Sequence, residues 1–180
     1  MSELPSGDIR PMCVDDLQRV LSWRNHPKIR QHMLTQHVIT AEEHRHWFER
    51  STHDPLRKIM VLEHQGQPFG LVHFTGVQAN ASVDWGFYLA PDAPKGSGVL
   101  LGQSALAFAF ETLHIHKLCG QVLDTNAASI RFHERQGFSL EGRLRQQVCI
   151  QSSHRDLLCF GLLHTEWSNR QPSKDSHVES

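Results

Sequence analysis

Hydrophobic residues recur with two different periods along the chain, and the change between the periods marks its regular elements. In the first third, after one short apolar run, apolar residues return every three or four positions, as on one face of a helix. Thr40 and Glu43 form a capping box, and Asp15 or Asp16 can cap an earlier helix that Pro27 ends. The pattern predicts a strand over residues 9–12 and three helices, ending before Pro27, near residue 33 and near residue 50.

The remaining two thirds alternate between short apolar runs, typical of buried strands, and two longer helical patterns. Gln65-Gly66-Gln67 separates two of the runs and predicts a hairpin, and Gly137 is placed to end the second helix. The predicted strands cover residues 58–64, 69–75, 81–89, 117–123, 142–150 and 156–163, and the helices cover residues 99–113 and 127–136. A polar turn at residues 151–154 joins the last two strands. Strands and helices in this order favour an α+β fold.

Composition and charge limit the kind of protein that this is. The 180 residues, 39% hydrophobic and 21% charged, suit one domain, predicted over residues 1–167 and followed by a flexible polar tail over residues 168–180. A net charge of −1 gives no general basic field, so we expect no nucleic-acid partner. The sequence has no apolar run of membrane length and no basic and apolar leader, which favours a cytoplasmic protein without membrane contact.

Cysteine and histidine raise the question of a metal site. The four cysteines have no C-x-x-C spacing and lie mostly in apolar segments, so we expect buried thiols rather than zinc ligands or disulfides. Among the 14 histidines, the pairs His44/His46 and His114/His116 are two positions apart, which directs side chains away from each other on a helix. We therefore expect no metal.

A glycine turn, Lys95-Gly96-Ser97-Gly98-Val99, lies between the strand over residues 81–89 and the following helix. The N–H groups of a first helical turn have no partner inside the helix, and glycines let an anion approach them closely. Lys95 adds a positive charge. From these residues alone, a phosphate site and an ordinary turn are equally good interpretations. The turn is neither a G-x-G-x-x-G dinucleotide motif nor a Walker loop.

A second motif follows the next predicted strand and reads Asn126-Ala127-Ala128-Ser129-Ile130-Arg131-Phe132-His133-Glu134-Arg135-Gln136-Gly137-Phe138. With the glycine turn and the order of elements, it resembles the GCN5-related N-acetyltransferases (GNAT). The resemblance implies the GNAT fold, a single mixed, mostly antiparallel sheet of about seven strands flanked by helices, with a splayed central strand pair. It also implies acetyl-CoA as cosubstrate, bound by Phe87, Leu89, Lys95, Gly96, Ser97, Gly98, Val99, Asn126, Ser129 and Phe132. Ala93 departs from the arginine or glutamine of the family.

The N-terminal segment resembles a narrower group. Trp23-Arg24-Asn25-His26-Pro27 and residues 39–48 are similar to the acetyltransferases of bacterial pseudaminic acid synthesis, and the likeness covers about residues 8–165. It implies direct transfer to the 4-amino group of a UDP-linked amino-dideoxy sugar, UDP-4-amino-4,6-dideoxy-N-acetyl-β-L-altrosamine, for flagellin glycans. It assigns the binding of this nucleotide-sugar substrate to Arg24, His44, Thr75 and Tyr88. An arginine fork suits a diphosphate, and a homodimer is compatible with the resemblance.

The resemblance also assigns the reacting groups. The N–H of Leu89 would donate to the thioester oxygen, and His133 stands where the family has a tyrosine near the sulfur, as a proton donor to the leaving thiolate. Related sugar enzymes use an acid where this chain has Gln121, which cannot take a proton. His73, acting through water, is therefore the candidate base. The structural alternatives are packing beside the sulfur for His133 and a sheet-face position without a role for His73.

Two other kinds of function are open at this point. The same chemistry serves acetyltransferases of ribosomal-protein N-termini, polyamines and aminoacyl compounds, and the changes at Ala93, Gln121 and His133 allow a sensor that binds acyl-CoA without catalysis. A polyamine needs an acceptor groove rich in carboxylates. The N-terminal helices instead carry basic and imidazole side chains, at Arg24, His26, Lys28, Arg30, His32 and His44. This balance favours an anionic small-molecule acceptor.

Overall fold

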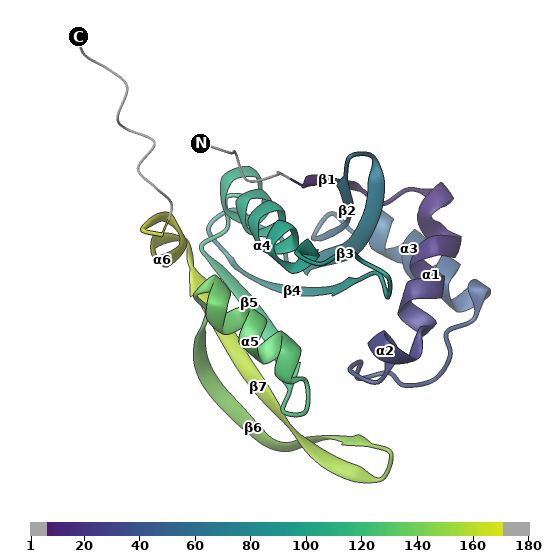
Figure 1. Ribbon diagram of the computed structural model, residues 1–180. Helices are drawn as coiled ribbons and strands as arrows, with labels where there is room; N and C mark the ends of the chain where they lie inside the picture. The colour runs from purple at the N-terminus through teal and green to yellow at the C-terminus, as the bar shows by residue number, and fades with distance from the viewer. Residues whose placement is uncertain (1–6, 171–180) are drawn as a thin grey trace.

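A computed structural model describes residues 7–170 of the chain. At its centre is a twisted seven-stranded sheet with the order β1-β2-β3-β4-β5-β7-β6, in which β4 and β5 are parallel and the other described pairs are antiparallel (Figure 1). The strands are β1 (Asp8–Pro11), β2 (Arg57–His64), β3 (Gln67–Thr75), β4 (Ser82–Leu89), β5 (Lys117–Leu123), β6 (Ser139–Ile150) and β7 (Ser153–Leu163). The predicted α+β class and mixed sheet are confirmed.

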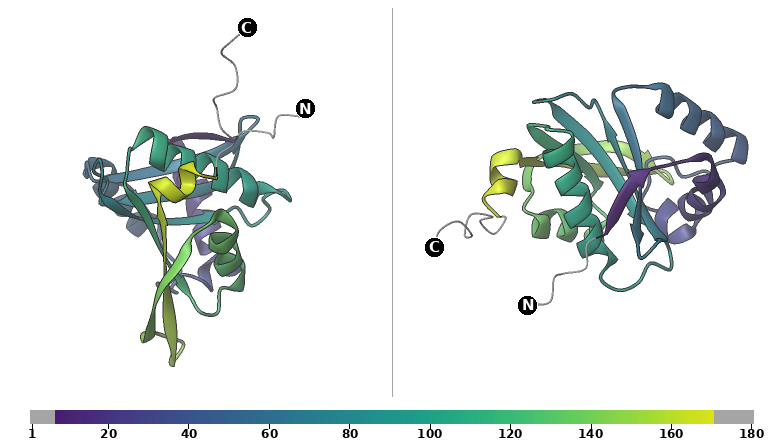
Figure 2. Two further views of the ribbon diagram at one scale, coloured as in Figure 1. Left: turned by 90° about the vertical axis from the view of Figure 1, so that its left-hand side faces the viewer. Right: turned by 90° about the horizontal axis from the view of Figure 1, so that it is seen from above.

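The helices cover the two faces of the sheet with separate cores (Figure 2). On one face, α1 and α3 place Val20, Trp23 and Phe48 against Val61 and Leu71. On the other face, α4, its π-helical continuation η2, and α5 enclose the larger core. The helices are η1 (Val14–Asp16), α1 (Leu17–Asn25), α2 (Pro27–Arg30), α3 (Ala41–His53), α4 (Ser97–Ala107), η2 (Phe108–Thr112), α5 (Ala127–Gln136) and α6 (His164–Ser168).

Local signals in the sequence place several helix ends. The Thr40 hydroxyl accepts from the N–H of Glu43 at 3.1 Å, and the Glu43 carboxylate accepts from the N–H of Thr40 at 2.7 Å, so the predicted capping box opens α3. Gly137, at φ +93°, ends α5 as predicted. Other ends differ: α2 stops at residue 30, α3 continues to residue 53, and the helix predicted over residues 99–113 changes to π-helical geometry at residue 108.

β6 and β7 form a long hairpin that reaches beyond the rest of the sheet (Figures 1 and 2). Gln151 and Ser152 make its turn, with φ values of +48° and +62°, the conformation that a two-residue hairpin turn needs. The four-residue turn predicted at residues 151–154 is therefore wrong. β6 begins at residue 139 and β7 at residue 153, earlier than predicted, because pairing between the two strands extends from Ser139 and Gly161 at one end to Ile150 and Ser153 at the turn.

The structure also bears on the predictions for the C-terminus and the cysteines. Ser168 is the last residue of α6, and residues 171–180 of the predicted tail lie outside the described residues. All four cysteines are free, but Cys13 and Cys149 are exposed and so are not the buried thiols predicted. Within residues 7–170, no helix is long and apolar enough to cross a membrane. The same residues contain no group of three or more metal-binding side chains.

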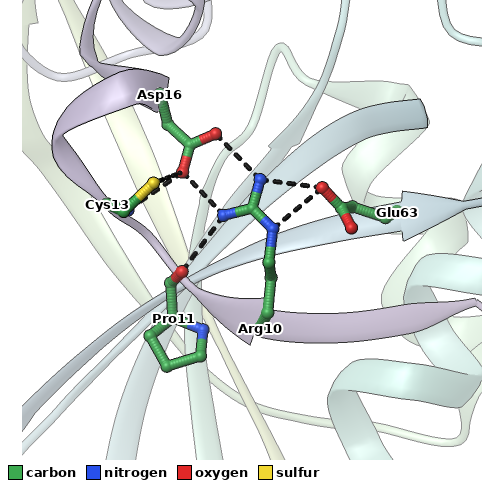
Figure 3. Close-up of polar contacts among 5 residues, drawn as sticks. All are labelled: Arg10, Pro11, Cys13, Asp16 and Glu63. Atoms are coloured by element: carbon green, nitrogen blue, oxygen red, sulfur yellow. Dashed lines mark hydrogen bonds and ion pairs between the residues drawn. The ribbon is translucent and has the colours of Figure 1, made fainter. Parts of the chain in front are cut away.

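An ion-pair cluster ties the N-terminal strand to the start of the helical layer (Figure 3). Arg10 on β1 donates to the two carboxylate oxygens of Asp16 at 2.7 and 2.9 Å, and to Glu63 on β2 at 2.8 Å. The N–H of Cys13 donates to the same Asp16 carboxylate at 2.9 Å. The sequence suggested that Asp16 could cap α1 with its side chain. In the structure it does not, because Arg10 and Cys13 hold its carboxylate oxygens. These hydrogen bonds, Arg10 first, lower the pKa of Asp16 to about 2.

Replacing Asp16 with asparagine should destabilise the fold by about 2 kcal/mol at pH 7. Folding lowers the pKa of Asp16 from 3.8 to about 2, so its contribution is present above pH 3.8 and is lost as the pH falls toward 2. Urea unfolding at pH 7 and pH 3 measures the difference between variant and native protein, which should shrink at the lower pH. Asp15→Asn, at an exposed neighbour, is the control. Equal effects of the two substitutions would contradict the role of the cluster.

Candidate active site

β4 and β5 separate in the middle of the sheet. Their parallel register runs to Trp85 and Gly120 and stops there, although β4 continues to Leu89 and β5 to Leu123. The predicted splayed strand pair is therefore present, with Trp85 and Gly120 at the apex of the gap between the strands.

The edge of β4 along this gap carries backbone groups that β3 does not use. The N–H of Ala90 donates to the carbonyl of Phe69 at 2.8 Å, which makes these two residues a hydrogen-bonded pair. Hydrogen-bonded and non-hydrogen-bonded positions alternate along an antiparallel ladder. Leu89 and Phe87 therefore direct their N–H and C=O groups away from β3 and into the gap.

The glycine turn lies where β4 leads into α4. Gly96 has φ +98°, a conformation that favours glycine, and it directly precedes the first residue of α4. Ser97 is buried, and its hydroxyl and N–H both donate to the carbonyl of Pro94, at 2.7 and 3.1 Å, which holds the turn. A Cβ added at Gly96 or Gly98 would meet nothing within 4 Å. Open space at the positive end of a helix suits an anion.

A pocket of about 680 Å³ reaches from the apex of the gap to the N-terminal helices. Of the site residues predicted from the sequence, it is lined by Arg24, His44, His73, Thr75, Phe87, Tyr88, Asn126, Ser129 and His133. Residues 89 and 95–99 do not line this pocket and belong to the strand end and the glycine turn beside it. Phe132 is 8% exposed, packs on the ring of Phe87 at 4.7 Å and does not line this pocket, and its contact with the coenzyme stays a prediction.

Arg24 brings a positive charge to the helical side of the pocket. Its Nη2 donates to the carbonyl of Thr35 at 2.8 Å, whereas its Nη1 is buried and has no hydrogen-bond partner within residues 7–170. Burial lowers the pKa of this guanidinium, but arginine stays charged at neutral pH. A buried cationic donor without a hydrogen-bond partner costs free energy until an acceptor binds to it. The arrangement is therefore suited to an anionic ligand.

His44 and Tyr88 are close enough to feel the charge of Arg24 and are themselves neutral. His44 is buried on α3 and stacks on Trp47 at a ring distance of 5.1 Å. Burial, followed by the charge of Arg24, lowers the pKa of His44. Burial raises the pKa of Tyr88, so its hydroxyl keeps its proton. Both side chains can donate hydrogen bonds without adding charge, and Trp47 adds a flat apolar wall to the pocket.

Two histidine rings pack directly against glycines of the separated strands β4 and β5. A Cβ at Gly86 on β4 would collide with Nε2 of His73, and a Cβ at Gly120 on β5 would lie 2.6 Å from Nε2 of His133. Burial lowers the pKa of each histidine to about 4. Both rings are therefore neutral at pH 7, one on each side of the gap.

The hydrogen bonds of His133 decide which ring nitrogen carries its proton. Nδ1 lies 2.8 Å from the carbonyl of Ser129, which can only accept, so Nδ1 is the protonated nitrogen. Nε2 is then an acceptor, and it is buried with no partner among the described residues. The neutral ring has no second proton to give. This geometry therefore does not provide the proton donor predicted for His133.

Several residues of the pocket went unnoticed as site residues in the sequence. Trp85 and Gly120 stand at the apex, Asp84 places a carboxylate on β4, and Cys119 lines the β5 side together with Gln121. In the sequence Trp85 is one more apolar residue of a strand, because the register that sets it beside Gly120 is a long-range property. A glycine inside a buried strand was the available signal, since it often marks a close approach of another group.

Comparison with known proteins identifies the family. Residues 8–139 match a family model described as the acetyltransferase (GNAT) domain. The chain belongs to the GNAT acetyltransferases. This GNAT protein is an acetyl-CoA-dependent N-acetyltransferase, which confirms the family and the enzyme class expected from the two motifs.

Relatives of this GNAT enzyme carry the names of different acetyltransferases. The acetyltransferase PseH of Campylobacter jejuni is 29% identical over 141 residues, which cover 77% of this chain and 88% of the relative. The spermidine N(1)-acetyltransferase of Escherichia coli K12 is 22% identical over 160 residues, 88% of this chain and 86% of the relative. The crystal structure of Vibrio cholerae spermidine N-acetyltransferase with CoA and spermine superposes with a TM-score of 0.82 at 22% identity, covering 91% of this chain and 99% of that one. This likeness shows the fold alone.

Proposed function

We propose that this GNAT enzyme transfers acetyl directly from acetyl-CoA to the 4-amino group of a UDP-linked amino-dideoxy sugar, in pseudaminic acid synthesis for flagellin glycans. The observation that carries the proposal is Arg24, whose buried Nη1 lacks a partner among the described residues although the side chain lines the pocket. A diphosphate supplies acceptor oxygens in the forked arrangement that arginine favours. The likeness to the acetyltransferase PseH over 77% of the chain supports the resemblance from which this acceptor class is taken.

In this proposal the neutral donors of the pocket orient the sugar. His44 and Tyr88 stand beside the guanidinium of Arg24 and would complete the contacts to the diphosphate and the adjoining sugar. Thr75, on β3, lies one position from Phe74 in the core and lines the pocket from the sheet side. The amino group then points toward the apex of the gap, where the two neutral histidines lie.

The proposed coenzyme position follows the free edge of β4. The glycine turn and the first turn of α4, at Lys95, Gly96 and Gly98, would hold the diphosphate, with Ser97 fixing the turn and Val99 beside it. The arm of the coenzyme would pair with the free N–H groups of the β4 edge and contact Asn126 and Ser129, which line the pocket from α5. Of the two free N–H groups, that of Phe87 lies nearer the apex than that of Leu89. We therefore assign the thioester oxygen to Phe87, in place of the Leu89 N–H that the resemblance suggested.

His73 is the proposed base, acting through one water. Its pKa of about 4 in the free enzyme keeps the ring in its proton-accepting form throughout pH 5 to 8. His73→Phe should lower kcat at pH 7 about tenfold, less than a general base usually contributes, because an amine flanked by electron-withdrawing carbons gives up its proton readily. The KM for acetyl-CoA should stay constant. His64→Phe, on the neighbouring strand and outside the pocket lining, is the control. An unchanged kcat in both variants would leave solvent water as the base.

A CoA-release assay across three acceptor classes tests the proposed function. The UDP-4-amino sugar should support turnover, whereas spermidine and a ribosomal-protein N-terminal peptide should not. Turnover with spermidine alone would overturn the proposal and would point to Asp84, a carboxylate of the pocket, as the group that receives a cationic amine. Binding of CoA without turnover on any of the three would instead indicate an acyl-CoA sensor.

A further inference from the structure

Trp85 and His133 present a hydrogen-bond donor and an acceptor side by side at the apex of the gap. Trp85 is 6% exposed and His133 is 2% exposed. Neither the indole N–H of Trp85 nor Nε2 of His133 has a hydrogen-bond partner among residues 7–170. The two nitrogens lie 2.9 and 2.6 Å from the one point where a Cβ on Gly120 would stand. They are no farther apart than the sum of these distances, a separation that one ligand atom placed beside Gly120 can bridge.

Packing holds both rings in this arrangement. The indole of Trp85 stacks on Phe138, with centroids 5.4 Å apart and the planes within 5°. His133 stacks on Phe160 at 5.1 Å and is tethered through Nδ1 to the carbonyl of Ser129. Neither ring can turn toward solvent without breaking these contacts. A buried donor and a buried acceptor that both stay unsatisfied are unfavourable, and their shared position in the pocket indicates a ligand that completes them.

The ligand atom best suited to a position between the Trp85 donor and the His133 acceptor is the sulfur of the coenzyme. The free edge of β4 runs from Leu89, at the end toward the glycine turn, to Trp85, at the apex, a distance of about 13 Å at 3.3 Å per residue. A coenzyme with its diphosphate at the turn and its arm along this edge carries its sulfur toward the apex. This step rests on the coenzyme position proposed above and is independent of the acceptor.

We infer that the indole N–H of Trp85 donates a hydrogen bond to the sulfur of acetyl-CoA as it leaves, in the place that the sequence suggested for His133. The acceptor nitrogen forms its bond to the acetyl carbon, and the carbon–sulfur bond breaks with its electron pair on sulfur. The indole stabilises this charge and keeps its own proton. The acceptor nitrogen gives its proton through water to His73, which returns it to solvent, and one proton from water ends on sulfur, so that the coenzyme leaves as a thiol. The resulting S–H then donates to Nε2 of His133, which is the acceptor of the pair.

Kinetics of one conservative variant tests the role of the donor. Trp85→Phe removes the N–H but keeps an aromatic ring against Phe138. We expect kcat to fall about tenfold and the KM for acetyl-CoA to change less than about twofold, because the donor acts on charge that develops only during the reaction. Trp167→Phe is the matched control: Trp167 is 7% exposed and stacks on Phe110 in the same core, and it does not line the pocket. Equal kcat values in the two variants would overturn the inference.

Spectroscopy gives a second test that does not depend on turnover or on the folding of a variant. In 15N-labelled native protein, CoA should shift the indole N–H resonance of Trp85 downfield, and desulfo-CoA, which lacks the sulfur, should not. The amide resonances of Phe87 and Leu89 should move with both ligands. An indole shift that is the same for both ligands, or absent while these amides move, would overturn the role of Trp85. If the amide resonances of Phe87 and Leu89 shift with neither ligand, the proposed coenzyme position is wrong, and the inference about Trp85 fails with it.

Discussion

Gly98→Asp should raise the Kd for CoA and the KM for acetyl-CoA by at least about 100-fold, because it sets a carboxylate where the proposed site holds a diphosphate. A like-charge contact of this kind opposes binding by several kcal/mol, and each 1.4 kcal/mol is a factor of ten in affinity. The new side chain also fills the open space in front of the first turn of α4. Isothermal titration with CoA measures the effect directly.

The same substitution should leave the fold intact, which separates lost binding from lost structure. A Cβ at Gly98 would meet nothing within 4 Å, and a carboxylate in the first turn of a helix is favourable. Gly142→Asp is the matched control, since Gly142 on β6 is equally free of neighbours within 4 Å and lies outside the pocket lining. Both variants should melt near the native temperature. Native CoA affinity in Gly98→Asp would mean that the turn is not the phosphate site.

Arg24→Gln should raise the KM for the UDP-amino sugar about 100-fold and leave the KM for acetyl-CoA within about twofold. A hydrogen bond to a charged group contributes about 1.5–3 kcal/mol, and the variant loses the charge and the buried Nη1 donor together. Arg24→Lys keeps the charge but loses the forked guanidinium, so its KM for the sugar should lie between those of the native enzyme and Arg24→Gln, about tenfold above native. Steady-state CoA release at varied sugar concentration measures these values.

Arg30→Gln removes the same charge a few residues away and provides the control. Arg30 lies close enough to lower the pKa of Arg24 but does not line the pocket. Its loss should change the sugar KM less than about twofold. Spermidine separates the two acceptor classes in the same experiment. A cationic polyamine would bind better without the positive charge of Arg24, so an improved spermidine KM in Arg24→Gln, with sugar turnover unchanged, would favour a polyamine acceptor.

Most elements of the fold could be predicted because their signals are local. The capping box at Thr40 and Glu43 and the left-handed Gly137 act within one helical turn, and both appear in the structure as expected. The turn at Gln151 and Ser152 could not be predicted in the same way. Neither residue is a glycine, and their positive φ values are held by the ladder of the surrounding hairpin. The length of this turn is therefore set by the pairing of β6 with β7 and not by the turn residues.

Only the part of the site that family resemblance and local backbone pattern indicate could be predicted from the sequence. The structure gathers Arg24, His44, Thr75 and Tyr88 on one pocket, as expected for a shared ligand, and their role in binding stays a prediction. The state of His133 was outside the reach of sequence, because it depends on the burial of its ring against Phe160 when α5 packs on the sheet. Phe132, adjacent in sequence, turns instead into the core.

The sequence by itself determined the features that a few consecutive residues can encode: the order of strands and helices, the glycine turn that opens α4, and the motif of α5. These depend on backbone conformation and on side chains within a turn of one another. Only the tertiary structure decided where β4 and β5 part and which polar atoms meet there. Trp85 and His133 come together because strand register and helix packing join residues 48 positions apart, and burial then leaves one donor and one acceptor for a ligand to complete.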